Sequence, residues 1–135
     1  MRTLTITIAA VSALAGAAIT PALAQVATPA GPVKTMAVPQ DAILSYSLIG
    51  LNTVDGANNT VGEIKDLVIE NRQLAGYILS VGGFLGMGEH YVAVSPSSVN
   101  VAWDGTANKW KATVNATKDQ LKSAPEFKYD GKFKK

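Results

Sequence analysis

The stretch LIGLNTVDGANNTVGEIKDLVIE, from Leu48 to Glu70, decides the fold. Its centre, Asp55–Asn59, has the Asp-Gly turn chemistry that joins neighbouring strands. After the turn, Ile64 and Leu67 have opposite strand parity, so the apolar phase changes around Lys65-Asp66. A bulge or sharp coil explains this change, and small closed barrels bend their strands in the same way. The stretch therefore predicts a hairpin whose second strand bends sharply.

The rest of the chain continues as short strands between turns. Turn sequences recur at Glu70–Gln73, Gly82–Glu89, Ser95–Ser98 and Asp104–Lys109. Leu74–Val81 is apolar on both parities, which predicts a central strand, whereas Val99–Asp104 and Lys109–Val114 alternate as half-buried strands do. The spacing leaves no room for βαβ units. We therefore expect an all-β fold, a small antiparallel β-barrel of about five to six strands.

One short helix is predicted near the C-terminus. Thr117 and Gln120 stand at the N-cap and N3 positions of a capping box. Ala116 and Leu121 occupy the positions of a hydrophobic staple, and Pro125 ends the helix.

The N-terminal residues have the pattern of a secretory signal peptide. Arg2 supplies a positive charge, an uncharged apolar run follows, and Ala22-Leu23-Ala24 suits signal peptidase. We expect cleavage after Ala24 and a periplasmic location. The next residues are rich in Pro and Ala and show no apolar period. The expected organisation is a cleaved signal peptide (1–24), a disordered linker (25–40), a domain (41–130) and a basic tail (131–135).

Composition and charge argue against a nucleic-acid binder and against a domain stabilised by disulfides. Removal of residues 1–24 leaves 111 residues with 11 Lys and Arg against 10 Asp and Glu, a net charge of +1. Such a balance is not that of a nucleic-acid binder. Because the chain has no Cys, the domain forms no disulfide and must be stabilised by burial.

Three segments in register resemble the PRC-barrel family, in its exported, single-domain bacterial type. They are the opening stretch quoted above, VGGFLGMGEHYVAV (Val81–Val94) and NATKDQLKSAPEFKY (Asn115–Tyr129). The resemblance implies a small β-barrel that serves binding and assembly and has no shared catalytic residues. The family fold occurs in the H subunit of the photosynthetic reaction centre and in a ribosome maturation factor. This sequence matches neither the spanning helix of the first nor the partner domain of the second, so neither role is expected here.

The glycines of Val81–Val94 are interpreted as structural. A dinucleotide fingerprint opens a helix and a P-loop needs Gly-Lys-Ser/Thr, whereas a strand follows these glycines. We expect a turn in which positive φ is supplied by Gly82, Gly83, Gly86 and Gly88. The three large apolar residues between them either cover the barrel mouth as core or form an exposed contact patch: Phe84, Leu85 and Met87.

No catalytic, metal or cofactor site is predicted. His90 is the only histidine, too little for a zinc site, and it is expected at the start of a strand. Glu63, Asp66 and Glu89 could be imagined as supplying a carboxylate pair for acid/base work, but the parity of Glu63 and Asp66 would place those two on opposite faces of a regular strand. Asp66 is better explained as a side chain that bonds to turn or bulge backbone.

The chain ends in lysines interleaved with aromatic residues. Lys128, Lys132, Lys134 and Lys135 are expected to be solvated, with weak contact to an anionic membrane surface as the alternative.

Together, these features predict a non-catalytic periplasmic binding or assembly module. Its partner would be an envelope protein, a membrane surface or a second copy of the chain. The alternative is a small-ligand carrier or enzyme that uses the barrel mouth.

Overall fold

The computed structural model describes Gly16 and residues 26–83 and 88–135. The chain divides into two units, Met1–Ala37 and Val38–Lys135. In the first unit, residues 26–37 are exposed and contain no helix or strand. None of the helices in the described ranges is long and apolar enough to cross a membrane. The fold described below is that of the second unit.

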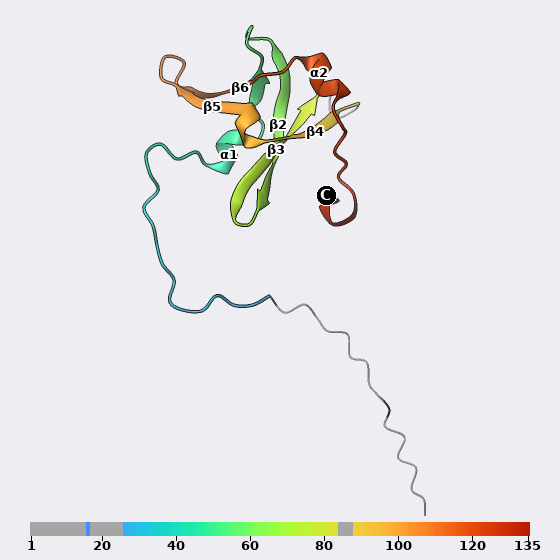
Figure 1. Cartoon of the computed structure of the whole chain (residues 1–135). Coiled ribbons are helices and arrows are strands. Elements are labelled where there is room, and N and C mark those ends of the chain that lie inside the picture. Colours follow the sequence, from blue (N-terminus) through green and yellow to red (C-terminus); the bar gives the residue numbers. More distant parts are fainter. Residues whose placement is uncertain (1–15, 17–25, 84–87) are drawn as a thin grey trace, which may run out of the picture. The chain divides into compact units, whose positions relative to one another are not determined.

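Six strands of the second unit form one sheet (Figure 1). In chain order the elements are α1 (Ser45–Leu48), β1 (Asn52–Val54), β2 (Thr60–Glu70), β3 (Gln73–Val81), β4 (His90–Val94), η1 (Pro96–Ser98), β5 (Val99–Asp104), β6 (Lys109–Val114), α2 (Lys118–Ser123) and η2 (Gly131–Phe133), where η denotes a 3₁₀ helix. The order of the strands in the sheet is β4-β3-β2-β1-β6-β5. The central position predicted for Leu74–Val81 is confirmed, since β3 lies between β2 and β4.

The predicted antiparallel barrel is wrong in one pairing, and closure is not confirmed. β1 pairs with β6 in parallel, while all other strand pairs are antiparallel. Five connections lead from β1 to β6, and four of them join antiparallel strands and so reverse the chain. The fifth, from β4 to β5 through η1, does not reverse it. An even number of reversals leaves β6 parallel to β1. The sheet is mixed and not closed, because β4 and β5 each have one neighbour among the described strands.

The predicted irregularity in β2 is confirmed. Against β3, Ile64 pairs with Leu79 and Asp66 with Ile78, so Lys65 is left without a partner in the ladder. Because of this bulge, Leu67 lies on the same face of β2 as Ile64. Ile64 is completely buried, and Leu67 is partly buried against the core. The Asp66 carboxylate accepts a hydrogen bond from the backbone N–H of Leu67 at 2.9 Å, as a bulge-bonding side chain should.

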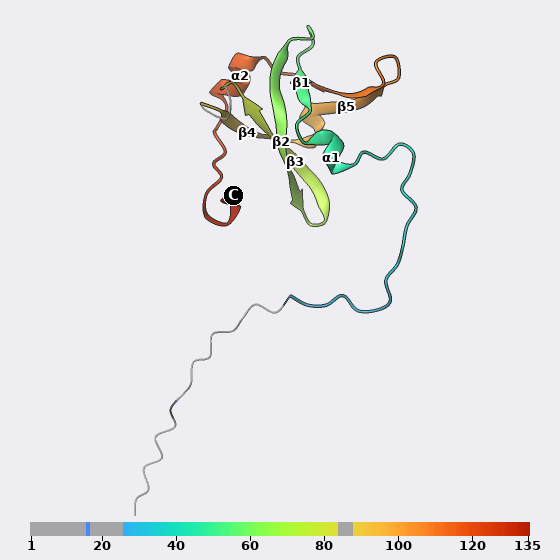
Figure 2. The same ribbon diagram turned by 180° about the vertical axis from the view of Figure 1, so that it is seen from behind.

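The β2–β3 hairpin extends beyond the other strands (Figures 1 and 2). Its turn consists of two residues, Asn71 and Arg72, both with positive φ (49° and 66°). This is the backbone of a type I′ turn, whose twist matches that of the strands it joins.

The core lies on one face of the bent sheet. It receives apolar side chains from both α-helices and from every strand except β1, which contributes the completely buried Thr53. Its members are Leu48, Val61, Ile64, Tyr77, Leu79, Val81, Val92, Val99, Ala112, Val114 and Leu121. Leu121 is placed by α2, which begins at a complete capping box. Thr117 Oγ1 accepts a hydrogen bond from Gln120 N at 3.2 Å, and Gln120 Oε1 accepts one from Thr117 N at 2.8 Å. The helix ends at Ser123, two residues before Pro125.

Candidate binding surfaces

The glycine segment is described only at its two ends. Gly82, Gly83 and Gly88 have φ of 73°, 79° and 71°, values that L side chains rarely adopt. Gly86 and the apolar residues Phe84, Leu85 and Met87 lie outside the described residues. The two alternatives for these side chains, core or contact patch, therefore stay predictions.

The C-terminal segment, residues 126–135, lies against β4 through its aromatic side chains. Phe127 N donates a hydrogen bond to Tyr91 O at 2.7 Å, which attaches the segment to the edge of the sheet. The Tyr129 ring stands edge-on to Tyr91, with centroids 5.1 Å apart. Figures 1 and 2 show the segment running from α2 alongside β4. The lysines of this segment are exposed, as expected, whereas Phe127 and Tyr129 between them are half-buried, because aromatic side chains gain from packing on the outer face of the sheet.

Three of the four C-terminal lysines, Lys128, Lys132 and Lys135, have contacts within the chain. Lys135 Nζ lies 3.9 Å from an Asp66 oxygen and 4.3 Å from the centroid of the Tyr129 ring. Lys128 Nζ lies 3.9 Å from a Glu126 oxygen, and Lys132 Nζ lies over the Phe133 ring at 5.0 Å. These contacts are weak individually, and of the three lysines it is Lys135 that contacts a strand of the sheet, through Asp66.

Two tyrosines bond to carboxylates on the same outer face. Tyr91 donates to Glu89, and Tyr129 donates to Asp66 at 3.4 Å. The hydrogen bond to Glu89 raises the pKa of Tyr91. Burial, followed by the charge of Asp66, raises the pKa of Tyr129 to about 12. Both phenols are therefore neutral hydrogen-bond donors near pH 7, which suits anchoring rather than proton abstraction.

His90 begins β4, as expected, and contacts the end of α2. Its Nε2 lies 3.0 Å from Ala124 O, and its Nδ1 lies 3.9 Å from a Glu126 oxygen. Among residues 26–83 and 88–135, no group of three or more His, Cys, Asp or Glu side chains could hold a metal ion.

An apolar surface lies on the β5–β6 hairpin. Trp103 and Trp110 are cross-strand partners with ring centroids 5.4 Å apart, and Trp103 remains 51% exposed. The two rings border a hollow of about 430 Å³ lined by Gln40, Asp41, Ile43, Val101, Ala102, Trp103 and Trp110. A half-exposed Trp on the edge strand β5 gives the domain a surface suited to contact with another molecule. We call this hollow and the two rings the tryptophan surface.

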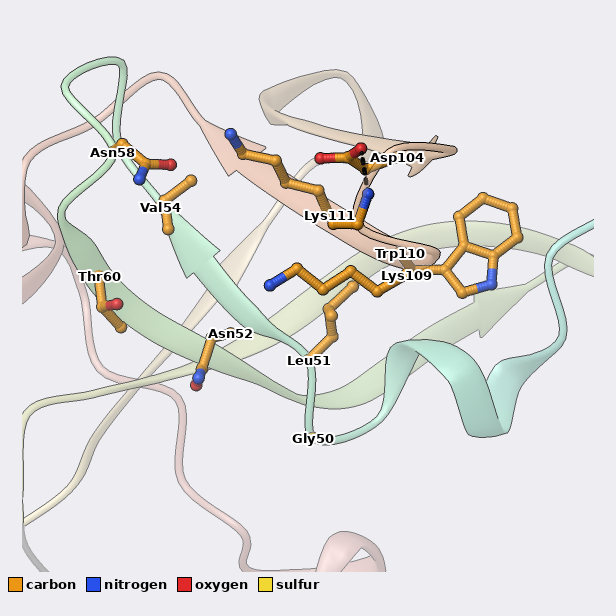
Figure 3. A pocket seen from close by; sticks show the side chains of 11 residues that line it. Gly50, Leu51, Asn52, Val54, Asn58, Thr60, Asp104, Lys109, Trp110 and Lys111 are labelled. Carbon is orange, nitrogen blue, oxygen red and sulfur yellow. Dashed lines mark hydrogen bonds between the residues drawn. The ribbon is translucent and has the colours of Figure 1, made fainter.

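A second, polar groove of about 580 Å³ lies across β6, β1 and the start of β2 (Figure 3). Its lining residues are Gly50, Leu51, Asn52, Val54, Asn58, Thr60, Asp104, Ala107, Lys109, Trp110 and Lys111. The side chains of Lys109 and Lys111 extend from β6 toward β1, while Asn52, Asn58 and Thr60 lie on the opposite side. We call this hollow the lysine groove.

Sequence reasoning missed both surfaces. The Trp103 and Trp110 positions were visible only as the apolar positions of two strands, with no sign that their rings would pair. The lysine groove depends on the parallel pairing of β1 with β6, which the antiparallel prediction excluded. The alternation of Lys109 and Lys111 with Trp110 was the one available signal, since it predicts two lysines on one face.

Residues 40–121 match the family model of the PRC-barrel domain. The chain belongs to the PRC-barrel family. The match covers most of the chain, from the residue before Asp41 to Leu121 in α2, and confirms the resemblance drawn from the sequence. No curated protein matches the chain. The C-terminal segment that packs against β4 lies beyond the matched PRC-barrel residues.

Proposed function

We propose that this PRC-barrel protein is a non-catalytic binding or assembly module that acts in the periplasm. The observation that carries the proposal is the tryptophan surface. Protein interfaces are enriched in Trp, and the residues that dominate binding energy are large aromatic side chains in partly enclosed apolar sites. Trp103 offers such a side chain on β5, an edge strand of the sheet. Its partner would be an envelope protein or a second copy of the chain.

The periplasmic part of the proposal rests on the N-terminal sequence pattern. Arg2, the uncharged run and Ala22-Leu23-Ala24 favour export with cleavage after Ala24. N-terminal sequencing of the protein from a periplasmic fraction should begin at Gln25. An intact Met1 in a membrane pellet would contradict export with cleavage.

Trp103→Ala tests the contact surface. Mature protein should be used to capture partners from envelope extracts, and its self-association should be followed by sedimentation velocity. We expect the substitution to weaken capture or self-association by about tenfold or more, the usual effect of truncating a dominant aromatic residue. Tyr46→Ala is the matched control, because Tyr46 is 77% exposed and does not line the tryptophan surface.

Two results would count against the proposal. One is equal loss in the Trp103 and Tyr46 variants, since a general loss of apolar surface would then explain the effect. The other is unchanged partner capture and self-association in Trp103→Ala. Circular dichroism must show that the variant is folded, because the Trp pair itself contributes about 0.5–1.5 kcal/mol to stability.

A further inference from the structure

In addition to the proposed protein contact at the tryptophan surface, the lysine groove offers a site for a small ligand. Lys109 and Lys111 alternate along β6 with Trp110 and Ala112, and Ala112 is completely buried in the core. Successive side chains of a strand face opposite sides of the sheet, so both lysines project from the face opposite the core. Two ammonium groups thus share one side of one groove (Figure 3).

The parallel pairing of β1 with β6 supplies polar groups beside these lysines. Thr53 pairs with Ala112, and both are completely buried on the core face. Asn52 therefore projects from the outer face with the lysines. Figure 3 shows Lys109 extending toward Asn52 and Lys111 extending toward Asn58. Amides and the Thr60 hydroxyl on this side can donate hydrogen bonds to a ligand between them and the lysines.

The positive charge of the lysine groove is not cancelled by close ion pairs. Within the described part of the chain, neither Lys109 nor Lys111 has a carboxylate oxygen within 4.0 Å. Asp104 is the one acidic residue in the lining. Its Oδ1 accepts backbone hydrogen bonds from Thr106 and Ala107, both at 3.0 Å. These bonds, with the Ala107 contribution the largest, lower the pKa of Asp104 and keep it ionised, so the groove has a net charge of +1 at pH 7.

We propose that the lysine groove binds a phosphate-bearing ligand. Lys109 and Lys111 would supply the charge, while Asn52, Asn58 and Thr60 would hydrogen-bond to the phosphate oxygens or to polar groups beside them. Lysine binds phosphate as a point charge, and several separate donors suit an anion with several acceptor oxygens. The groove volume of about 580 Å³ falls in the range of about 300–1,000 Å³ found for small-molecule sites. The phosphate could belong to a free phosphate ester or to a lipid head group.

Two binding assays distinguish these sources. Glycerol phosphate is titrated into the mature protein by calorimetry, with sodium acetate at equal ionic strength as the comparison anion. Flotation with phosphatidylglycerol vesicles, compared with phosphatidylcholine vesicles, tests a head group. Binding of glycerol phosphate supports a free ester, and binding only to phosphatidylglycerol supports a head group presented at a surface.

The decisive variant combines Lys109→Gln with Lys111→Gln. We expect it to weaken binding by about tenfold or more, since each lost charge-assisted hydrogen bond has a large effect. The matched control combines Lys34→Gln with Lys134→Gln, which removes the same charge from residues outside the groove and should leave binding unchanged. Thr60→Val, nearly equal in volume to the wild type, should weaken binding several-fold without changing net charge.

Three outcomes would overturn the proposal. The first is that neither glycerol phosphate nor phosphatidylglycerol binds. The second is that acetate binds as well as glycerol phosphate, which would indicate charge attraction without a phosphate site. The third is equal weakening by the groove and control variants, which would assign binding to overall charge or to the tail. None of these outcomes depends on Trp103.

Discussion

Gly62 lies in β2, directly beside the backbone of β3. A Cβ atom at this position would stand 2.7 Å from the carbonyl oxygen of Ser80, and 3.4 Å from a methyl group of Val81. The oxygen cannot move aside easily, because β3 is paired with β2 on one side and β4 on the other. Gly62→Ala should therefore force the two strands apart and destabilise the domain by about 1–3 kcal/mol, the usual cost of overpacking.

Urea denaturation followed by circular dichroism measures this cost as a shift of the transition midpoint at constant slope. In a thermal melt, each kcal/mol should lower Tm by about 4–8 °C for a domain of this size. Gly56→Ala is the matched control, because its Cβ would meet nothing within 4 Å and its φ is not positive. It should be neutral, or stabilise by about 0.4–1 kcal/mol through the unfolded state. An unchanged midpoint in Gly62→Ala, or an equal loss in both variants, would refute the close-approach argument.

Two further predictions concern the C-terminal elements. Thr117→Ala should lower stability by about 0.5–2 kcal/mol, because α2 loses its N-cap, and an unchanged urea midpoint would mean that the cap does not stabilise the docked helix. The pKa of Tyr129, raised from 10.0 to about 12, gives a stabilisation that is complete below pH 10 and is lost as pH rises through about 12. The difference in unfolding free energy between wild type and Tyr129→Phe should therefore shrink between pH 10 and about pH 12. Phenolate absorbance reports the titration of Tyr129 over the same range. A constant difference would show that Tyr129 titrates normally.

The sequence by itself determined the features that depend on neighbours along the chain. The capping box joins Thr117 to Gln120, and its hydrogen bonds span three residues. The opposite parity of Ile64 and Leu67 required an extra residue in β2, and the bulge at Lys65 supplies it. The strands and the family resemblance followed in the same way, because turn chemistry and strand periodicity are local properties.

Tertiary structure decided how distant segments meet. Composition marked Ser95–Ser98 as a turn, but a turn sequence does not say whether the chain reverses. Pro96–Ser98 forms a 3₁₀ helix that keeps the chain direction, and this choice makes β1 parallel to β6 through the pairing of Thr53 with Ala112. The same pairing creates the lysine groove.

The packed tail has a similar origin. Lys135 reaches Asp66 only because the aromatic residues before it pack on the outer face of β4, where Tyr129 stands against Tyr91. Alternating Lys and aromatic residues are compatible with either solvation or packing. The choice between them depends on whether a surface of matching shape and charge lies within reach, and that surface is built from residues far away in the sequence.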